Sequence, residues 1–279
     1  MIGYSGDTTL ADAQRRGVAF ATAQGVTSLA QLRAMPAADL MKRWAGFTRG
    51  APTGPIVDGW ILPEAPARVF AAHLEMSVPL ITGNNAREAL SVPTEAELPE
   101  RLRAVFGSAL PSAEALYPGS AAPDPVLGTS ANKFATDIAF RCPAVVMEEW
   151  HAQQGAPVYA YQFEQPLPGQ EAAGAQHSTE VSFVFGTLNM LAMATGGAEP
   201  SAPAAQLSEA MMTYWTNFAK TGDPNGPGVP HWPRFTPESG AYVHLNGAGI
   251  REGTKLRGKA CDLFRAAVLP KLVAPTADP

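Results

Sequence analysis

Two short apolar runs, each followed by a polar loop, most constrain how this chain can fold. The first run is Val78–Thr82, which ends at a Gly-Asn-Asn triplet, and the second covers 157–163 with the sequence Pro-Val-Tyr-Ala-Tyr-Gln-Phe. Runs of this length and composition are typical of strands buried on both faces. Helical patterns precede, separate and follow them, and this alternation predicts an α/β fold.

Apolar residues recur at helical spacing in several further segments, which are separated by Gly- and Pro-rich connections. No internal repeat and no domain boundary is visible, so residues 1–279 are predicted to form a single domain. Predicted helices cover residues 9–24, 28–35, 37–45, 93–106, 131–154, 203–220 and 255–269, and a third, small strand covers 241–245.

Composition and charge exclude several classes of protein. Hydrophobic residues make up 46% of the chain and charged residues 16%, which is enough apolar material for a sizeable core and argues against general disorder. The 20 basic and 25 acidic residues give a net charge of −5 without any Lys/Arg run, so no nucleic-acid partner is expected. No apolar stretch approaches the ~20 residues that span a bilayer, and no signal peptide is recognisable. Cytoplasm is therefore the predicted location, although export of a longer parent protein stays open.

The two cysteines, Cys142 and Cys261, lie far apart in the sequence and away from any histidine at metal-ligand spacing. Cys142 belongs to an apolar run, where a free thiol packs as a small hydrophobic group. The sequence therefore predicts buried free thiols rather than a disulfide, and no metal site. Dinucleotide, nucleotide, zinc-protease and calcium-loop motifs are all missing, so no cofactor is expected.

Glu88 and His177 are the strongest candidates for chemistry. Each follows a predicted buried strand and would emerge at the carboxyl end of the sheet, where open α/β sheets place their sites. A carboxylate that accepts the Nδ1 proton of a histidine fixes its tautomer and stabilises the imidazolium formed when Nε2 takes a proton. On spacing alone a simpler interpretation is favoured, in which Glu88 pairs with Arg87 and His177 caps a helix that begins near Ser178.

The remaining histidines, His73, His151, His231 and His244, are interpreted as structural or solvated. A Glu-His pair of this kind needs a hydroxyl nucleophile, but the strained Gly-x-Ser-x-Gly elbow does not occur in the chain. A Ser-x-x-Lys match at Ser130 has no accompanying motif and is expected by chance. The chain thus offers an acid and a base without a nucleophile.

The chain resembles the C-terminal half of the type-B carboxylesterases, the carboxylesterase/cholinesterase family of the α/β-hydrolase fold that includes bacterial p-nitrobenzyl esterases. The most specific segment is 215–225, Trp-Thr-Asn-Phe-Ala-Lys-Thr-Gly-Asp-Pro-Asn, followed by Trp232-Pro233. Further matching segments follow the family order, and they are 32–36, 55–63, 78–84 with Glu88, 137–143, 157–163, 174–177 with Glu180, and 184–186.

This resemblance implies that Glu88 is the acid and His177 the base of a Ser-Glu-His triad that hydrolyses small-molecule carboxylic esters through an acyl-enzyme. Hydrolysis of amides or lactones by the same triad is an alternative that the sequence leaves open. The resemblance also implies that the nucleophile elbow, the oxyanion loop and the first strands of the sheet precede this sequence. We therefore expect an incomplete α/β-hydrolase domain that is inactive or nearly so by itself.

An incomplete sheet would leave one edge strand unpaired and an apolar face uncovered. Such a chain is expected to pair with a separate N-terminal half or to self-associate. The alternative is a non-catalytic remnant that binds a hydrophobic ligand or a protein partner.

Overall fold

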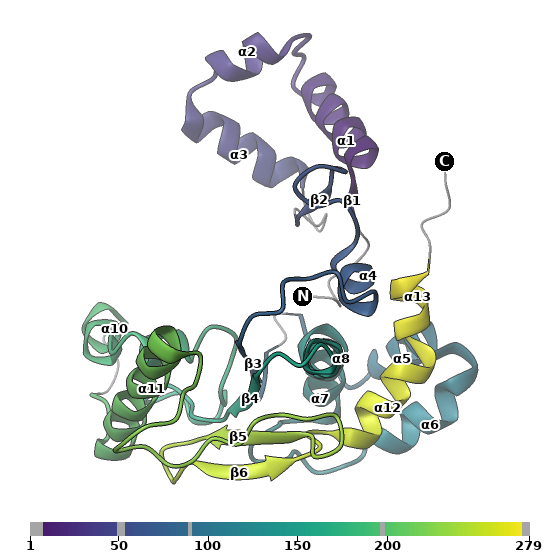
Figure 1. Ribbon diagram of the computed structural model, residues 1–279. Coiled ribbons are helices and arrows are strands. Elements are labelled where there is room, and N and C mark those ends of the chain that lie inside the picture. Colours follow the sequence, from purple (N-terminus) through teal and green to yellow (C-terminus); the bar gives the residue numbers. More distant parts are fainter. Residues whose placement is uncertain (1–7, 49–53, 89–90, 196–198, 275–279) are drawn as a thin grey trace.

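The computed structural model describes residues 8–48, 54–88, 91–195 and 199–274. Figure 1 shows a sheet with helices on both sides and a separate group of helices formed by the first part of the chain. The strands are β1 (Thr8–Thr9), β2 (Ile56–Val57), β3 (Leu80–Asn85), β4 (Val158–Phe163), β5 (Ala241–Leu245) and β6 (Arg251–Thr254).

The helices before β4 begin with α1 (Leu10–Ala23), α2 (Leu29–Ala34), α3 (Ala37–Phe47) and α4 (Pro66–Ala71), and continue with α5 (Leu98–Phe106), the short 3-10 helix η1 (Gly107–Ala109), α6 (Leu110–Leu116), α7 (Ser130–Thr136), the π-helical turn η2 (Asp137–Arg141) and α8 (Cys142–Gln153). The helices after β4 are α9 (Val181–Val184), α10 (Leu188–Thr195), α11 (Ala202–Thr221), α12 (Gly258–Ala267) and α13 (Leu269–Val273).

Helices α1 to α3 form a small unit of their own, which extends away from the sheet in Figure 1. The side chain of Thr9 caps α1, and Ser28 forms a capping box with Gln31 at the start of α2. The rings of Trp44 and Phe47 meet Phe20 edge to face, with centroids 5.1 and 5.4 Å from it. These three aromatic rings pack α1 against α3, and Phe20 is the one buried residue of α1.

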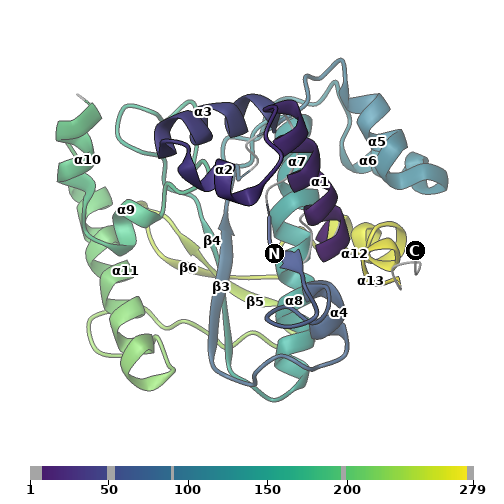
Figure 2. The same ribbon diagram turned by 90° about the horizontal axis from the view of Figure 1, so that it is seen from above.

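The main sheet has the strand order β3-β4-β5-β6. Strands β3, β4 and β5 are parallel, with Gly83 beside Tyr161 and Gln162 beside His244, and β6 is antiparallel to β5. Figure 2 shows α8 and α11 on opposite sides of these strands. Within the described residues β3 pairs with β4 alone, so its other edge is unpaired, as the sequence predicts.

The two faces of the sheet bury different side chains, because successive residues of a strand point to opposite sides. The face toward α9 and α11 carries Tyr159, Tyr161, Phe163, Val243 and Leu245, which pack with Trp232. The opposite face carries Val158 and Ala160, which pack with Phe235 and Tyr242. A third cluster of apolar residues lies between α5, α6, α7, α8 and α12, with Leu98, Leu102 and Phe264 among its members.

The prediction that Cys142 and Cys261 carry free thiols is wrong, because the two residues form a disulfide. Their Cα atoms lie 4.9 Å apart although 119 positions separate them in the sequence, since α8 packs against α12. That distance is within the range a disulfide requires, and both cysteines are completely buried. The sequence could not show this proximity, because it arises from the packing of two distant helices.

The long helix predicted over 131–154 is interrupted by the π-helical turn, where a buried ionic cluster lies. Asp137 is fully buried and accepts hydrogen bonds from Arg141, Arg257 and the hydroxyl of Tyr117. The oxygen–nitrogen distances to Arg257 are 3.0 and 2.8 Å, and Arg141 has no exposed side-chain surface. One carboxylate thus pairs with two guanidinium groups, one from the next turn and one from 120 positions further along the chain.

Replacing Asp137 with asparagine is expected to destabilise the fold by about 3 to 5 kcal/mol, because it leaves the buried charge of Arg141 uncompensated. Chemical denaturation of the variant measures this difference. The exposed pair of Asp12 with Arg15 offers a matched control, for which Asp12→Asn should change stability little. Equal effects of the two substitutions would show that burial does not determine the contribution of these pairs.

Several elements differ from the prediction. The helix expected from residue 93 begins at Leu98, and the first predicted strand runs three residues further, to Asn85. Strand β6 was not predicted, because its residues Arg-Glu-Gly-Thr lack the apolar alternation by which strands are recognised. Within the described residues, no helix combines the length and apolar character needed to cross a bilayer.

Candidate active site

The ends of β3 and β4 bring the two predicted site residues together. Beyond the last strand residues the two chain segments stay adjacent, since Arg87 and Gln176 form a parallel bridge and the Arg87 amide donates to Ala175 over 2.9 Å. Glu88 and His177 each follow this bridge by one residue. The loop between Phe163 and His177 therefore folds back to the end of β3, so that positions far apart in sequence become neighbours.

Glu88 and His177 form a direct hydrogen bond. The distance from Glu88 Oε2 to His177 Nδ1 is 2.6 Å. The second carboxylate oxygen of Glu88, Oε1, accepts from the backbone amide of Asn85 over 2.8 Å, and Glu88 is only 6% exposed. Two donors thus fix the carboxylate in a buried position.

The geometry determines which nitrogen of His177 remains free. A proton on Nδ1 is donated to the ionised Glu88, which leaves Nε2 as the acceptor. The described residues provide no hydrogen-bond partner for Nε2, and the side chain is 36% exposed. The ring of Phe140 lies 5.4 Å from the imidazole ring, between centroids, and limits its movement on one side. An imidazole held in this way can accept a proton from a group that reaches it from outside.

Asn85 holds the loop that carries His177. Its Nδ2 donates to the carbonyl of Gln176 over 2.6 Å and also to the carboxylate of Glu180. Burial raises the pKa of Glu180, against the opposing effect of this hydrogen bond from Asn85. The next residue after the histidine, Ser178, has φ +66°, a left-handed conformation that is uncommon outside glycine. A strained residue at this position is typical of functional loops whose surroundings impose their shape.

The simpler interpretation of Glu88 as a partner of Arg87 does not match the structure. Arg87 instead donates to backbone carbonyls of Pro125, Val126, Ala172 and Ala173, at distances from 2.9 to 3.1 Å. Gly174 packs against this guanidinium, with φ +72°, and a Cβ there would lie 2.6 Å from Arg87 Nε. Arg87 thus joins the two loops that flank the site. His177 does not cap α9 either, because that helix begins at Val181.

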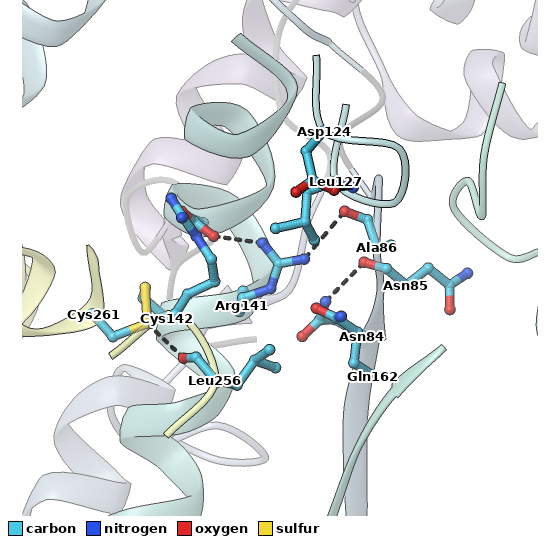
Figure 3. A network of polar contacts seen from close by, with 12 residues as sticks. Asn84, Asn85, Ala86, Asp124, Leu127, Arg141, Cys142, Gln162, Leu256 and Cys261 are labelled. Carbon is cyan, nitrogen blue, oxygen red and sulfur yellow. Dashed lines mark hydrogen bonds and ion pairs between the residues drawn. A yellow bond between two sulfur atoms is a disulfide. The ribbon is translucent and has the colours of Figure 1, made fainter. Parts of the chain in front are cut away.

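Arg141 stabilises the backbone that carries Glu88, a role that the sequence analysis did not predict. Its Nη2 donates to the carbonyl of Ala86 over 3.1 Å, between the end of β3 and Glu88. Figure 3 shows this bond beside the Cys142–Cys261 disulfide and the side chains of Asn84 and Asn85. A charged residue in the apolar stretch 138–147 was the only available signal in the sequence.

Three other histidines also contact a glutamate through Nδ1, so the pair alone does not define a site. His151 Nδ1 lies 3.1 Å from Glu75 Oε1, but its Nε2 is hydrogen-bonded to the carbonyl oxygen of Val78, and both side chains are buried. His231 and Glu252 form an exposed surface pair.

His244 pairs with the buried Glu164, and a Cβ at Gly253 would lie 2.8 Å from His244 Nε2. The backbone of Gly253 thus lies close to Nε2, and the His244 side chain is only 16% exposed. His177 therefore combines a buried carboxylate partner with an accessible second nitrogen in a way that the other three pairs do not. In the parts of the chain that the structure describes, no group of three or more His, Cys, Asp or Glu residues could hold a metal ion.

Comparison with known proteins identifies the family. A sequence profile described as the carboxylesterase family matches residues 119–264, which is more than half of the chain. The chain belongs to this family. The match includes β4, the His177 loop, α11 and most of α12, whereas Glu88 lies outside it.

Individual carboxylesterases are similar over a larger part of the chain. Carboxylesterase 5A of Canis lupus familiaris is 30% identical over 265 residues, which cover 86% of this chain and 44% of that protein. Acetylcholinesterase of Gallus gallus is 38% identical over 146 residues, which cover 50% of this chain and 18% of that protein. The solved structure of a thermophilic pNB esterase superposes with a TM-score of 0.73 at 26% identity, covering 93% of this chain and 55% of the esterase.

These comparisons confirm the predicted resemblance and the partial α/β-hydrolase fold. The chain spans less than half the length of the two curated relatives and about half that of the solved esterase.

Proposed function

We propose that this chain supplies the acid and the base of a Ser-Glu-His triad that hydrolyses small-molecule carboxylic esters. The supporting observation is the 2.6 Å hydrogen bond from Glu88 to His177 Nδ1, with Nε2 left accessible. The 279 residues contain no Gly-x-Ser-x-Gly elbow. In this proposal the nucleophilic serine and the oxyanion donors therefore come from polypeptide outside these residues.

The proposed chemistry is acyl transfer in two steps. The serine oxygen bonds to the ester carbonyl carbon while its proton passes to His177 Nε2, and Glu88 stabilises the resulting imidazolium. The imidazolium then gives this proton to the departing alcohol. In the second step His177 takes a proton from water, the hydroxide oxygen bonds to the acyl carbon, and the proton returns to the serine oxygen as the acid leaves.

The unpaired edge of β3 supports the expected pairing with further strands. Large apolar side chains also lie exposed on α10 and just after α9, with Phe185 at 73%, Met190 at 69% and Met193 at 86%. An uncovered apolar surface of this kind fits a contact with more polypeptide. The same surface favours the second candidate function, a non-catalytic protein that binds a hydrophobic partner.

The disulfide bears on where this chemistry takes place. Disulfides between buried cysteines persist mainly in oxidising compartments. The Cys142–Cys261 bond therefore supports an exported or periplasmic protein rather than the cytoplasmic protein that the sequence predicts.

Labelling with a serine-directed fluorophosphonate tests the proposed function. We expect no covalent adduct on this chain alone, and an adduct on the added polypeptide when a carboxylesterase N-terminal segment with a nucleophile elbow is supplied. His177→Ala in the combined sample should abolish the labelling, because the serine loses its base. An adduct on a serine of this chain alone would contradict the division of the triad. Labelling unaffected by His177→Ala would favour the non-catalytic candidate.

A further inference from the structure

A cavity whose lining includes neither Glu88 nor His177 lies between the sheet and helices α8 and α12. Its volume is about 230 Å³, enough for a small organic molecule. Strands β3, β4 and β5 form one wall, and the segment before β5 contributes Phe235. Asn84 and Cys261, both drawn in Figure 3, belong to its lining.

Glu148 of α8 is the unusual member of this lining. It is 3% exposed, and its carboxyl group forms no hydrogen bond with the described residues. A buried carboxyl without a partner is costly, so such groups are rare unless something else satisfies them. Because Glu148 lines the cavity, the partner it lacks can be supplied by a molecule bound there.

The other polar groups of the cavity show what kind of molecule fits. Asn84 uses its Nδ2 to donate to the carbonyl of Asn85, which leaves its Oδ1 as an acceptor. The guanidinium of Arg265 is already paired with the carboxylates of Glu149 and Asp262, and its Nη1 lies 2.7 Å from Asp262 Oδ1. The carboxyl group of Glu148 and Asn84 Oδ1 are thus two acceptors of this lining, which also includes the side chains of Lys255, Tyr161 and Tyr242.

Aromatic side chains complete the cavity. The rings of Phe235 and Tyr242 both belong to its lining and are at least nine-tenths buried. Aromatic faces attract cations as well as alkyl groups. An acceptor pair beside two aromatic rings is suited to a ligand with a positively charged donor at one end and a short apolar tail.

We propose that this cavity binds a small primary alkylammonium ion, with its nitrogen hydrogen-bonded to the Glu148 carboxylate and Asn84 Oδ1. This binding site is separate from the Glu88–His177 pair and does not depend on the proposed ester chemistry. Neither a neutral alcohol nor a carboxylate satisfies the same acceptors with charge complementarity.

Binding should release a proton. Burial, together with the neighbouring Glu149, raises the pKa of Glu148 to about 8, so the carboxyl is mostly protonated at neutral pH. The ammonium ion binds the ionised form, and the carboxyl proton passes to the solvent. The other titratable and charged groups that line the cavity around Glu148 are Tyr161, Tyr242, Lys255, Asp262 and Arg265, with Glu149 on the same helix.

Isothermal titration of the 279-residue protein with propylammonium chloride tests the proposal. We expect one saturable site with a dissociation constant on the order of 1 mM, since so small a ligand offers few contacts. Repeating the titration in buffers of different ionisation enthalpy should show release of up to one proton at neutral pH. The affinity should rise about tenfold per pH unit up to about pH 8 and then level off.

Three controls make the result decisive. Glu148→Gln should abolish binding, whereas Glu209→Gln on the distant helix α11 should leave it unchanged. Propanol, which has a similar shape without the charge, should bind at least tenfold more weakly. Equal binding of propanol, no saturable binding of propylammonium, or binding retained in Glu148→Gln would each overturn the proposal.

The pH dependence of stability provides a readout without any ligand. The pKa of Glu148 is raised from 4.5 to about 8 on folding, so the folded state holds a proton that the unfolded state releases. The stabilisation from this proton is fully present below about pH 4.5 and disappears as the pH rises to about 8. The folding equilibrium constant should fall by up to about tenfold per pH unit across this window, and Glu148→Gln should remove that slope. An unchanged slope in the variant would show that Glu148 is not the buried, unpartnered acid the proposal requires.

Discussion

Replacing His177 with alanine is expected to lower ester turnover of the combined enzyme by about a million-fold, the loss seen when a triad histidine is removed from subtilisin. The reason is that Nε2 is the atom positioned to take the proton of the serine, with Nδ1 already committed to Glu88. Hydrolysis of a p-nitrophenyl ester by the combined chains measures the effect. Binding of the two chains should remain, because His177 is partly exposed and supports no other described contact except the ring of Phe140.

A graded series separates the base from its partner. Glu88→Gln keeps the shape of the acid but offers an amide to Nδ1, and should cost about ten-thousand-fold, as the analogous change does in trypsin-like triads. His231→Ala removes a histidine whose glutamate partner is exposed, and should leave turnover unchanged. Turnover that survives His177→Ala, or that falls equally in His231→Ala, would remove this pair from the mechanism.

Removing the disulfide should have the largest effect on stability. Loop-closure entropy for a bridge across 119 positions corresponds to about 5 kcal/mol at room temperature, and native disulfides typically contribute about 2 to 5 kcal/mol. We therefore expect Cys142→Ser with Cys261→Ser to lower the free energy of unfolding by several kcal/mol. Urea denaturation monitored by tryptophan fluorescence measures this loss, because Trp232 is completely buried in the core beside the sheet.

The reductant response is the matched control for that experiment. Dithiothreitol should destabilise the natural chain by a similar amount and should not affect the double variant. Both cysteines are completely buried, so reduction should be slow until the protein opens. If the unmodified protein is equally stable with and without reductant, the Cys142–Cys261 disulfide does not form in solution.

The sequence predicted the parts of the fold that depend on local pattern. Strand β4 and helix α1 have the apolar pattern and end signals that place them correctly, and the polar positions after the two strands lead to Glu88 and His177. The catalytic roles of these two residues stay a prediction. The interpretation of residues 1–279 as a single incomplete domain stays a prediction as well.

The sequence could not predict features that arise from contacts between distant segments. The disulfide depends on the packing of α8 against α12, and Arg257 reaches Asp137 across 120 positions. The role of Arg87 also needed the fold, because its four carbonyl partners lie in two other loops. Glu148 is one of two adjacent glutamates in a helical pattern, and only the structure shows that its carboxyl group forms no hydrogen bond with the described residues.

NMR of protein labelled isotopically at histidine most directly tests whether His177 is the base of an acid–base pair. The account predicts that the neutral imidazole of His177 carries its proton on Nδ1, with a strongly deshielded proton resonance that disappears in Glu88→Gln, and that Nε2 is unprotonated. A proton on Nε2, or an Nδ1 resonance unchanged in Glu88→Gln, would contradict it.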